Sequence, residues 1–265
     1  KVAIVCDWLT GIGGAEKVVR EILLCFPDAD VFSLIDFYDD PKRKKYLLGK
    51  KSKTSFLQRI PYSKKFYRFL FPLFPHAIES LNLDGYDLII SSSSSVAKGI
   101  RKNKSQLHIC YCHSPVRYAW DLREDYLSVM NSKLSKYVFN FFLERLKSWD
   151  LLSNDRVDFF IANSVNVKNR IRNNYQRDAT VIYPPVDINS FTITTQKQNY
   201  YFTVSRLVAY KKIAQIVKAF EKFPHLNLIV AGDGPNRKKL LNLAPPNVQI
   251  IGFISTEELR DKIRN

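Results

Sequence analysis

The sequence predicts an α/β protein with two Rossmann-like domains, each a doubly wound parallel sheet. Three observations support this fold class. Short apolar strands alternate with helical segments along most of the 265 residues. A Pro-Pro stop and a polar stretch interrupt the alternation, and a second strand–helix series then begins. We therefore expect a first domain at 1–188, a linker at 189–199 and a second domain at 200–265.

The first domain opens with a buried strand, a glycine turn and a helix. Six apolar strands are expected there, at 2–6, 31–35, 88–91, 107–112, 159–162 and 180–183. Helices are expected at 15–26 and at 128–152, where apolar residues recur at helical spacing. Ser164 is a predicted N-cap, and its helix runs to Tyr175.

The second domain repeats this alternation over a shorter length. Its expected strands are 200–204, 226–231 and 248–251, and its expected helices are 213–223, 237–243 and 256–263. Ser255 caps the last helix, with Glu258 completing a capping box. Three strands are too few to cover both faces and both edges of a parallel sheet, so we expect this domain to be incomplete at Asn265.

The composition is that of a folded protein, with 46% hydrophobic and 25% charged residues. No apolar run approaches the roughly 20 residues that a membrane-spanning helix needs. The four cysteines lie in apolar stretches. We therefore expect buried free thiols in a reducing compartment rather than a disulfide framework.

The net charge of +16 is concentrated in one segment. Residues 41–76 contain eleven Lys or Arg, no Asp or Glu, and eight aromatic residues. This mixture favours contact with an anionic membrane, and the expected contact residues are Lys64, Lys65, Phe66, Arg68 and Phe69. A solvated basic segment whose aromatic residues fold into a local core remains an open alternative. Nucleic acid is less favoured, because aromatic residues flanked by lysines are typical of membrane interfaces.

A candidate phosphate site follows two strands of the second domain. One strand ends at Ser205 and Arg206, and Lys211 lies at the mouth of the next helix. Fixed positive charges beside a helix N-terminus are suited to a diphosphate. The next strand ends in a tight turn that contains Gly232 and Gly234, which can bring backbone N–H groups close to a ligand. The alternative is that Arg206 and Lys211 are ordinary surface charges.

Two other site classes are less well supported. Gly11 and Gly13 begin a dinucleotide fingerprint, but Glu16 occupies its third glycine position, which makes NAD unfavourable; Asp36 would be the ribose ligand. His108, Cys110 and Cys112 share one face of a strand and His113 points the other way, so a buried strand explains them better than a metal site.

Seven short motifs follow one another along the chain. They are Gly13-Gly14-Ala15-Glu16, Tyr111-Cys112-His113-Ser114-Pro115, Ala162-Asn163-Ser164, Tyr183-Pro184-Pro185-Val186-Asp187, Ser205-Arg206-Leu207 with Lys211, Ala231-Gly232-Asp233-Gly234-Pro235 and Ile251-Gly252-Phe253-Ile254-Ser255. This ordered set resembles the retaining GT-B glycosyltransferases of family 4, also called glycosyl transferases group 1, and the resemblance covers nearly the whole chain. Within 110–121 it is nearest to bacterial and archaeal mannosyltransferases of surface polysaccharide assembly. The family's Glu-x7-Glu motif is absent from this sequence.

The resemblance implies roles for particular residues. His113, Arg206 and Lys211 would be the catalytic residues: the two cations would hold the diphosphate leaving group without a metal, and His113 would bond the donor sugar. The donor site would contain Gly13, Gly14, Ser205, Arg206, Lys211, Gly232, Gly234, Phe253 and Ile254. Tyr118, Trp120 and Asp121 are candidate acceptor contacts, although a core Trp and a helix-capping Asp are the simpler interpretation.

We therefore expect a hexosyltransferase, specifically a mannosyltransferase that uses GDP-mannose and no other cofactor. Its acceptor would be lipid-linked or a polysaccharide, at the cytoplasmic face of the membrane, with the protein peripheral there and no nucleic-acid partner. An inactive nucleotide- or glycan-binding module of the same fold is the first alternative. An NAD-dependent enzyme is the second.

Overall fold

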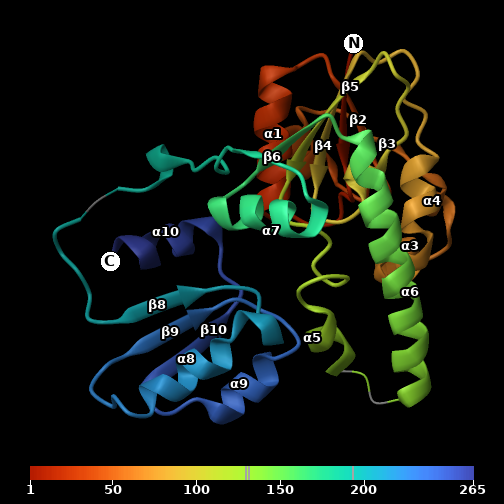
Figure 1. The fold of residues 1–265 in the computed structure, drawn as a ribbon. Helices are drawn as coiled ribbons and strands as arrows, with labels where there is room; N and C mark the ends of the chain where they lie inside the picture. The colour runs from red at the N-terminus through yellow and green to blue at the C-terminus, as the bar shows by residue number, and fades with distance from the viewer. Residues whose placement is uncertain (129, 131, 193) are drawn as a thin grey trace. The chain divides into compact units, whose positions relative to one another are not determined.

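The computed structural model describes residues 1–128, 130, 132–192 and 194–265 (Figure 1). The chain divides into two compact units, Lys1–Pro185 and Val186–Asn265. Each unit is built around one parallel sheet with helices packed on it, which is the α/β class that the alternating pattern predicts.

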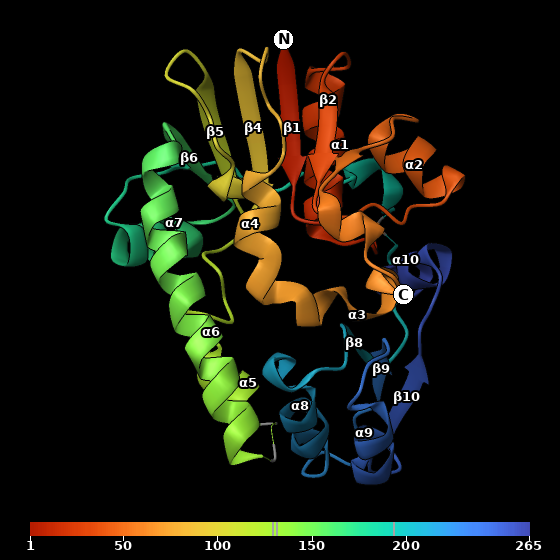
Figure 2. The same ribbon diagram turned by 90° about the vertical axis from the view of Figure 1, so that its right-hand side faces the viewer.

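The sheet of the first unit has seven parallel strands in the order β3-β2-β1-β4-β5-β6-β7. Figure 2 shows the middle of this order, from β2 through β1, β4 and β5 to β6. The first strand, β1, pairs with β2 on one side and with β4 on the other. The chain order therefore reverses at β1, which is the topological switch point where α/β sheets bind ligands at their carboxyl ends. The strands are β1 (Val2–Cys6), β2 (Asp30–Ser33), β3 (Lys53–Thr54), β4 (Leu88–Ser93), β5 (Leu107–Cys112), β6 (Phe159–Ala162) and β7 (Thr180–Val181).

Six of these strands lie where the sequence predicts them, and β3 is an addition. It pairs two residues of the basic segment with Phe32 and Ser33 of β2 at the sheet edge. A two-residue strand has no measurable alternation of apolar and polar side chains, so periodicity could not reveal it.

The helices predicted for the first unit are present, with one difference in bounds. The expected helix 128–152 is α6 (Lys133–Leu152), which begins later, and the short helix before it, α5 (Arg123–Ser128), was not predicted. Ser132 is the N-cap of α6, and its hydroxyl accepts a hydrogen bond from the backbone N–H of Ser135. The other long helices are α1 (Gly14–Cys25) and α7 (Val165–Tyr175), and α7 begins after the predicted cap, Ser164.

The basic segment is folded. It forms the helices α2 (Asp40–Leu47), α3 (Ser63–Phe66) and α4 (Phe74–Glu79), together with the 3-10 turns η1 (Phe56–Arg59) and η2 (Tyr67–Leu73). Its aromatic side chains divide between two environments. Tyr67 and Phe74 are buried in the core, whereas Phe66 and Phe69 are exposed. The expected local core is therefore confirmed for part of the segment, and membrane contact through the exposed part stays a prediction.

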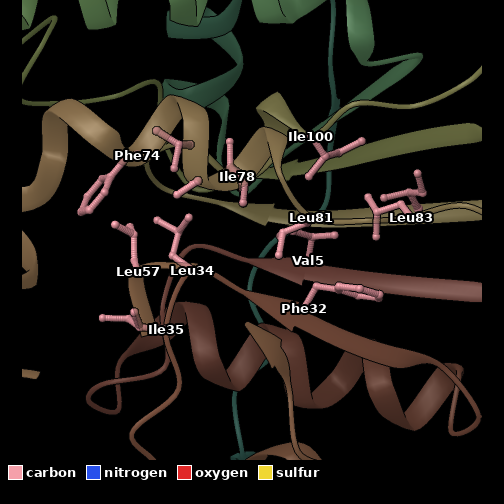
Figure 3. Close-up of a cluster of buried hydrophobic side chains, with 14 of the residues drawn as sticks. Val5, Phe32, Leu34, Ile35, Leu57, Phe74, Ile78, Leu81, Leu83 and Ile100 are labelled. Atoms are coloured by element: carbon pink, nitrogen blue, oxygen red, sulfur yellow. The ribbon is translucent and has the colours of Figure 1, made fainter. Parts of the chain in front are cut away.

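The main core of the first unit lies between the sheet and the segment that ends in α4. Figure 3 shows Val5 and Phe32 of the sheet facing Ile78 of α4, with Leu57 and Phe74 beside them. All five side chains are at most 3% exposed. Burial of such side chains is the principal stabilising contribution to a fold of this kind, at about 2 kcal/mol each.

A buried ion pair fastens the end of α6 to the turn after β4. Lys98 Nζ lies 3.0 Å from Asp150 Oδ1, and both side chains are at most 1% exposed. The same ammonium donates to Ser153 Oγ. The other carboxylate oxygen, Asp150 Oδ2, accepts hydrogen bonds from Trp120 Nε1 and from the hydroxyl of Tyr175. The network thus joins the 97–99 turn, α6 and α7.

The second unit has a three-stranded parallel sheet in the order β10-β9-β8. Its core contains the buried residues Leu207, Val217, Val230 and Leu240. The predicted capping box of Ser255 and Glu258 is confirmed at the start of the last helix. The elements are β8 (Tyr201–Val204), α8 (Ile213–Phe220), β9 (Leu228–Ala231), α9 (Arg237–Leu243), β10 (Val248–Gly252) and α10 (Thr256–Arg264), visible in Figure 1.

The cysteines are all free thiols, but one is not buried. Cys6, Cys110 and Cys112 lie in the core, whereas Cys25 is exposed. The expectation of burial is wrong for Cys25 because it is the last residue of α1 and, like its neighbour Leu24, lies on the solvent side of that helix. No helix in the described part of the chain is long and apolar enough to cross a bilayer.

Replacing Asp150 should strongly destabilise the first unit. In Asp150→Ala the ammonium of Lys98 stays buried without its counter-ion, which typically costs about 3–5 kcal/mol, so we expect a loss of that size. Urea unfolding followed by circular dichroism measures it. Glu144→Ala, which removes an exposed carboxylate from the same helix, is the matched control and should change stability far less. Equal losses in the two variants would contradict a special role for Asp150.

Candidate functional site

The turns that follow the three strands of the second unit are joined into one rim. The N–H of Ser205 donates to the carbonyl of Ala231 at 3.1 Å, and the N–H of Gly232 donates to the carbonyl of Gly252 at 2.6 Å. The N–H of Leu207 also donates to the carbonyl of Asp233 at 2.9 Å. Parallel strands end at the same edge of a sheet, so these bonds fix the backbone there before any ligand arrives.

Gly232 and Gly234 allow this close approach. A Cβ on Gly232 would lie 1.9 Å from the carbonyl oxygen of Ser205, and a Cβ on Gly234 would lie 2.5 Å from that of Leu207. Gly232 also has a φ of +125°, which side chains rarely permit. Glycine is therefore required at both positions because a side chain would collide with the backbone of a neighbouring turn. The sequence had suggested only that these glycines allow a ligand to come close.

Arg206 and Lys211 both lie exposed at this rim. Among the ion pairs found in the described residues, none joins either side chain to a carboxylate. Lys211 Nζ lies 5.9 Å from the ring centre of its neighbour Tyr210. The next residue, Lys212, has a φ of +56° and is the N-cap of α8. Both cations therefore remain available to an anion that binds at the rim.

A third cation lies at the same edge and was missed from the sequence. The guanidinium of Arg237, the first residue of α9, is 3.1 Å from the position that a Cβ on Gly252 would take. Beyond Gly252, Phe253 is 84% exposed and Ile254 is partly exposed. An exposed aromatic ring is a surface on which another flat ring can stack.

In the first unit, the carboxylate of Asp7 organises the carboxyl ends of β1 and β4. Asp7 is 5% exposed. Its Oδ2 accepts hydrogen bonds from the N–H groups of Ser94 and Ser95, and its Oδ1 accepts from those of Val96 and Ala97. Burial raises the pKa of Asp7, and these hydrogen bonds oppose the rise. The signal that could have revealed it is an Asp at the end of the first strand and a later run of five serines.

The predicted glycine turn lies beside Asp7. Gly13 is the exposed N-cap of α1, and its N–H donates to Glu16 Oε2 at 2.7 Å. Burial raises the pKa of the Glu16 carboxyl. Glu16, Asp7, Trp8 and Ser92 are among the residues that line one small pocket at the switch point. Gly14 is exposed at the first turn of α1.

His113 follows β5 at the same edge of the sheet. Its Nε2 lies 2.8 Å from the hydroxyl of Ser92, and its ring packs 5.2 Å from that of Tyr111. Burial lowers the pKa of His113 to about 4. The imidazole is therefore neutral near pH 7 and can act as a hydrogen-bonding group rather than as a cation.

The three candidate acceptor contacts are held by other parts of the first unit. The hydroxyl of Tyr118 lies 2.6 Å from Ser95 Oγ. Trp120 donates its Nε1–H to Asp150, and Asp121 pairs with Arg170 at 3.1 Å. These contacts favour a structural role for Tyr118 and Trp120.

The residues of the metal and NAD alternatives also have protein partners. His108 is buried, with Nε2 at 2.8 Å from Ser91 Oγ and Nδ1 at 2.8 Å from the carbonyl of Arg156. Asp36 forms an ion pair with Arg43 at 2.6 Å, so both of its carboxylate oxygens have partners within the protein. Within residues 1–128, 130, 132–192 and 194–265, no group of three His, Cys, Asp or Glu side chains is arranged to hold a metal ion.

Two α/β units, each built on a parallel sheet, are typical of the GT-B class of glycosyltransferases, in which a nucleotide-sugar is the donor. The family model described as Glycosyltransferase Family 4 matches residues 12–190, and the model of Glycosyl transferases group 1 matches residues 187–265. The first match covers more than half of the chain. The chain therefore belongs to glycosyltransferase family 4.

Solved structures show the same fold. HepE from Anabaena, solved with UDP and glucose, is 16% identical, with 96% of this chain and 70% of HepE covered and a TM-score of 0.61. TarM from S. aureus is 11% identical, with 98% and 78% covered and a TM-score of 0.57. A glycosyltransferase from Rickettsia africae is 15% identical, with 96% and 68% covered and a TM-score of 0.51. No curated protein matches the chain.

The neutral state of His113 predicts a pH dependence of stability. The pKa of His113 is about 4 in the folded protein and about 6.5 in an unfolded chain, so the unfolded state binds the proton more readily between these values. Its contribution to stability is complete above about pH 6.5 and is lost as the pH falls through 4. As the pH falls from about 6.5 to 4, the free energy of unfolding of the wild type should decrease by up to about 3 kcal/mol more than that of His113→Gln.

Urea unfolding at a series of pH values measures this difference. His108, whose pKa burial also lowers to about 4, is present in both proteins and so does not contribute to the comparison. Stability curves that stay parallel between the wild type and His113→Gln would show that His113 is not held in its neutral form.

Proposed function

We propose that this protein transfers a hexose from a nucleotide-sugar, with retention of configuration. The observation that carries this proposal is the rim of the second unit, where Arg206 and Lys211 are exposed, lack carboxylate partners among the described residues and lie beside three turns bonded to one another. The family supplies the reaction class. The donor we propose is GDP-mannose, because residues 110–121 resemble mannosyltransferases.

The chemistry required of this rim is stabilisation of a leaving group. As the glycosidic bond breaks, negative charge grows on the donor's diphosphate. Two cations held at a preformed backbone rim can stabilise that charge, and each such group typically lowers the barrier by about 3 kcal/mol. In this proposal Arg206 and Lys211 do so without a metal, while Gly232 and Gly234 keep the turns close enough for both cations to serve one diphosphate.

The remaining donor contacts follow from chemistry. The turn of Phe253 and Ile254 would contact the nucleobase, because Phe253 presents an exposed ring. His113 would hydrogen-bond the donor sugar from the first unit as a neutral imidazole, held by Ser92. The turn of Gly13 and Gly14 would contact the donor through the backbone N–H of Gly14, because the N–H of Gly13 already donates to Glu16. None of these groups is required to act as a nucleophile. This agrees with a mechanism in which the acceptor attacks the sugar on the same face from which the diphosphate departs.

The proposed acceptor is lipid-linked or a polysaccharide, at the cytoplasmic face of a membrane that the protein contacts peripherally. Support comes from the α3–η2 surface, which we define as Lys64, Lys65, Phe66, Arg68 and Phe69. Phe69 is 77% exposed and Phe66 is 46% exposed, and the three cations are also exposed. Exposed aromatic rings among acid-free basic residues are typical of surfaces that meet anionic lipid.

Removing either rim cation should slow transfer. We expect Arg206→Ala and Lys211→Ala each to lower kcat/KM by on the order of 100-fold, because charge on the departing diphosphate loses a stabilising partner. The measurement is release of GDP from GDP-mannose, with UDP- and ADP-sugars run in parallel to identify the base. Lys218→Ala, which removes an exposed lysine farther along α8, is the control and should leave the rate unchanged.

The possible outcomes separate the candidates. Activity that survives both substitutions would contradict the assigned role of the rim. Binding of GDP or GDP-mannose without transfer would favour a nucleotide- or glycan-binding module of the same fold. Binding of NADH without GDP would favour the dinucleotide alternative.

Neutralising the α3–η2 surface should weaken membrane binding. We expect Lys64→Ser/Lys65→Ser/Arg68→Ser to lower partitioning onto anionic vesicles by up to roughly 100-fold, since each basic residue near such a surface contributes about 1 kcal/mol. Flotation with phosphatidylglycerol vesicles measures this. Lys17→Ser/Lys104→Ser/Arg172→Ser removes the same charge from other exposed sites of the first unit and is the control. If both triple variants bind as the wild type does, the α3–η2 surface is not a membrane contact.

A further inference from the structure

The N-terminal turns of α6 carry an apolar stripe that lies open to solvent. Leu134, Tyr137, Val138 and Phe141 are spaced so that they share one face of the helix. They are 72, 73, 45 and 49% exposed, respectively. Single exposed apolar side chains are common, but four adjacent ones on one helical face mark a contact surface.

The other sides of the helix pack against the rest of the first unit and so fix the position of the stripe. The rings of Phe139 and Phe142 pack edge-on against Phe71 of η2, with ring centres 5.1 and 6.3 Å away. Arg123 of α5 donates to Asn140 Oδ1 at 2.9 Å and forms an ion pair with Glu144. The exposed face is therefore presented by a helix that is packed on its other sides.

The charges near the stripe are mostly positive. Residues 133–145 contain Lys133, Lys136 and Arg145, and the single carboxylate among them, Glu144, forms an ion pair with Arg123. Arg145 lies over the ring of Phe141, with its guanidinium 5.2 Å from the ring centre. A helix with exposed aromatic and aliphatic side chains on one face and lysines at its margin is suited to lie in the headgroup region of an anionic bilayer.

The helix that carries the stripe is linked to the α3–η2 surface through η2. Phe71, which packs on α6, is two residues from the exposed Phe69 in the same 3-10 turn. Figure 2 shows α4 beside α6, with α3 farther from it. Since α6 leads through its C-terminal end into the start of β6, its N-terminal turns lie toward the carboxyl edge of the sheet, where His113 follows β5.

We propose that the first three turns of α6 form a second membrane-contacting arm, which inserts Leu134, Tyr137 and Phe141 into the headgroup–acyl boundary of an anionic bilayer. This inference rests on the proposed membrane contact and extends it to a helix about 60 residues farther along the chain. Two arms joined through Phe71 would fix the orientation of the first unit, with its carboxyl edge toward a lipid-linked acceptor. A bilayer is a better occupant than a second copy of the chain, because a self-contact would bring Lys133, Lys136 and Arg145 of both copies together, and the nearby carboxylate of Glu144 is already paired with Arg123.

Site-specific labelling tests the insertion directly. Cys25 is the exposed thiol among the cysteines, so Cys25→Ser gives a background in which an introduced cysteine takes the label. We would attach an environment-sensitive fluorophore at Tyr137→Cys, at Phe66→Cys and at Phe159→Cys. Phe159 is 62% exposed at the amino end of β6 and is the control. The probe is a vesicle of equal parts phosphatidylglycerol and phosphatidylcholine, with or without acyl-chain nitroxide.

The expected result is a blue shift and nitroxide quenching of the labels at 137 and 66, and neither change at 159. A companion variant, Leu134→Ser/Tyr137→Ser/Phe141→Ser, should bind these vesicles at least about threefold more weakly, because apolar area leaves the interface. Leu24→Ser, an exposed leucine on α1, should bind as the wild type does. Circular dichroism would establish that each variant is folded.

Other outcomes overturn distinct claims. A response at 66 with none at 137 contradicts the α6 arm and leaves the α3–η2 contact standing. Absence of vesicle binding by the wild type contradicts the proposed membrane contact itself. A companion variant that binds vesicles normally but changes its mass in light scattering would show that the stripe joins two copies of the chain.

Discussion

The buried pair of Lys98 and Asp150 is the constraint on which the arrangement of the first unit depends. Two charges without solvent require partners, and here the carboxylate also accepts from Trp120 and Tyr175. The turn after β4, the C-terminal end of α6 and α7 must therefore meet at one point. These contacts fix the position of α6 relative to the sheet, and therefore the position of the exposed stripe on α6. They also hold Trp120, in the segment that follows His113.

The sequence correctly predicted the helices and strands that depend on interactions between residues close together in the chain. The capped helices after Ser164 and Ser255 follow from hydroxyls that bond their own first turns, and the long strands follow from their apolar runs. The start of α6 was misplaced because the apolar residues that predicted the helix lie within it and do not mark its first residue, although Ser132 supplies a cap. The edge strand β3 exists only through its pairing with β2, which no window of sequence contains.

The candidate site shows the same distinction between local and long-range causes. Arg206 and Lys211 could be selected from the sequence because charges directly after a buried strand are informative by themselves. Asp7 was missed, since its four backbone N–H partners lie almost ninety residues away along the chain and only the later run of serines hints at them. Gly232 was recognised as a turn glycine, but the reason that a side chain is excluded there is a contact with the turn after the neighbouring strand. The carbonyl oxygen of Ser205 lies 1.9 Å from the position that a Cβ would take.

The cations of this protein fall into two groups, those paired with carboxylates inside the fold and those left unpaired at its surface. Lys98 and Arg43 are buried or nearly so and neutralised by carboxylates, so they serve the fold. Arg206, Lys211 and the α3–η2 surface are exposed to solvent, where unpaired charge of one sign opposes compaction and contributes no stability. Charge retained at such places is explained by anions outside the chain. On the proposed function these are a diphosphate at one unit and lipid headgroups at the other, so one electrostatic bias attracts both the donor and the surface that carries the acceptor.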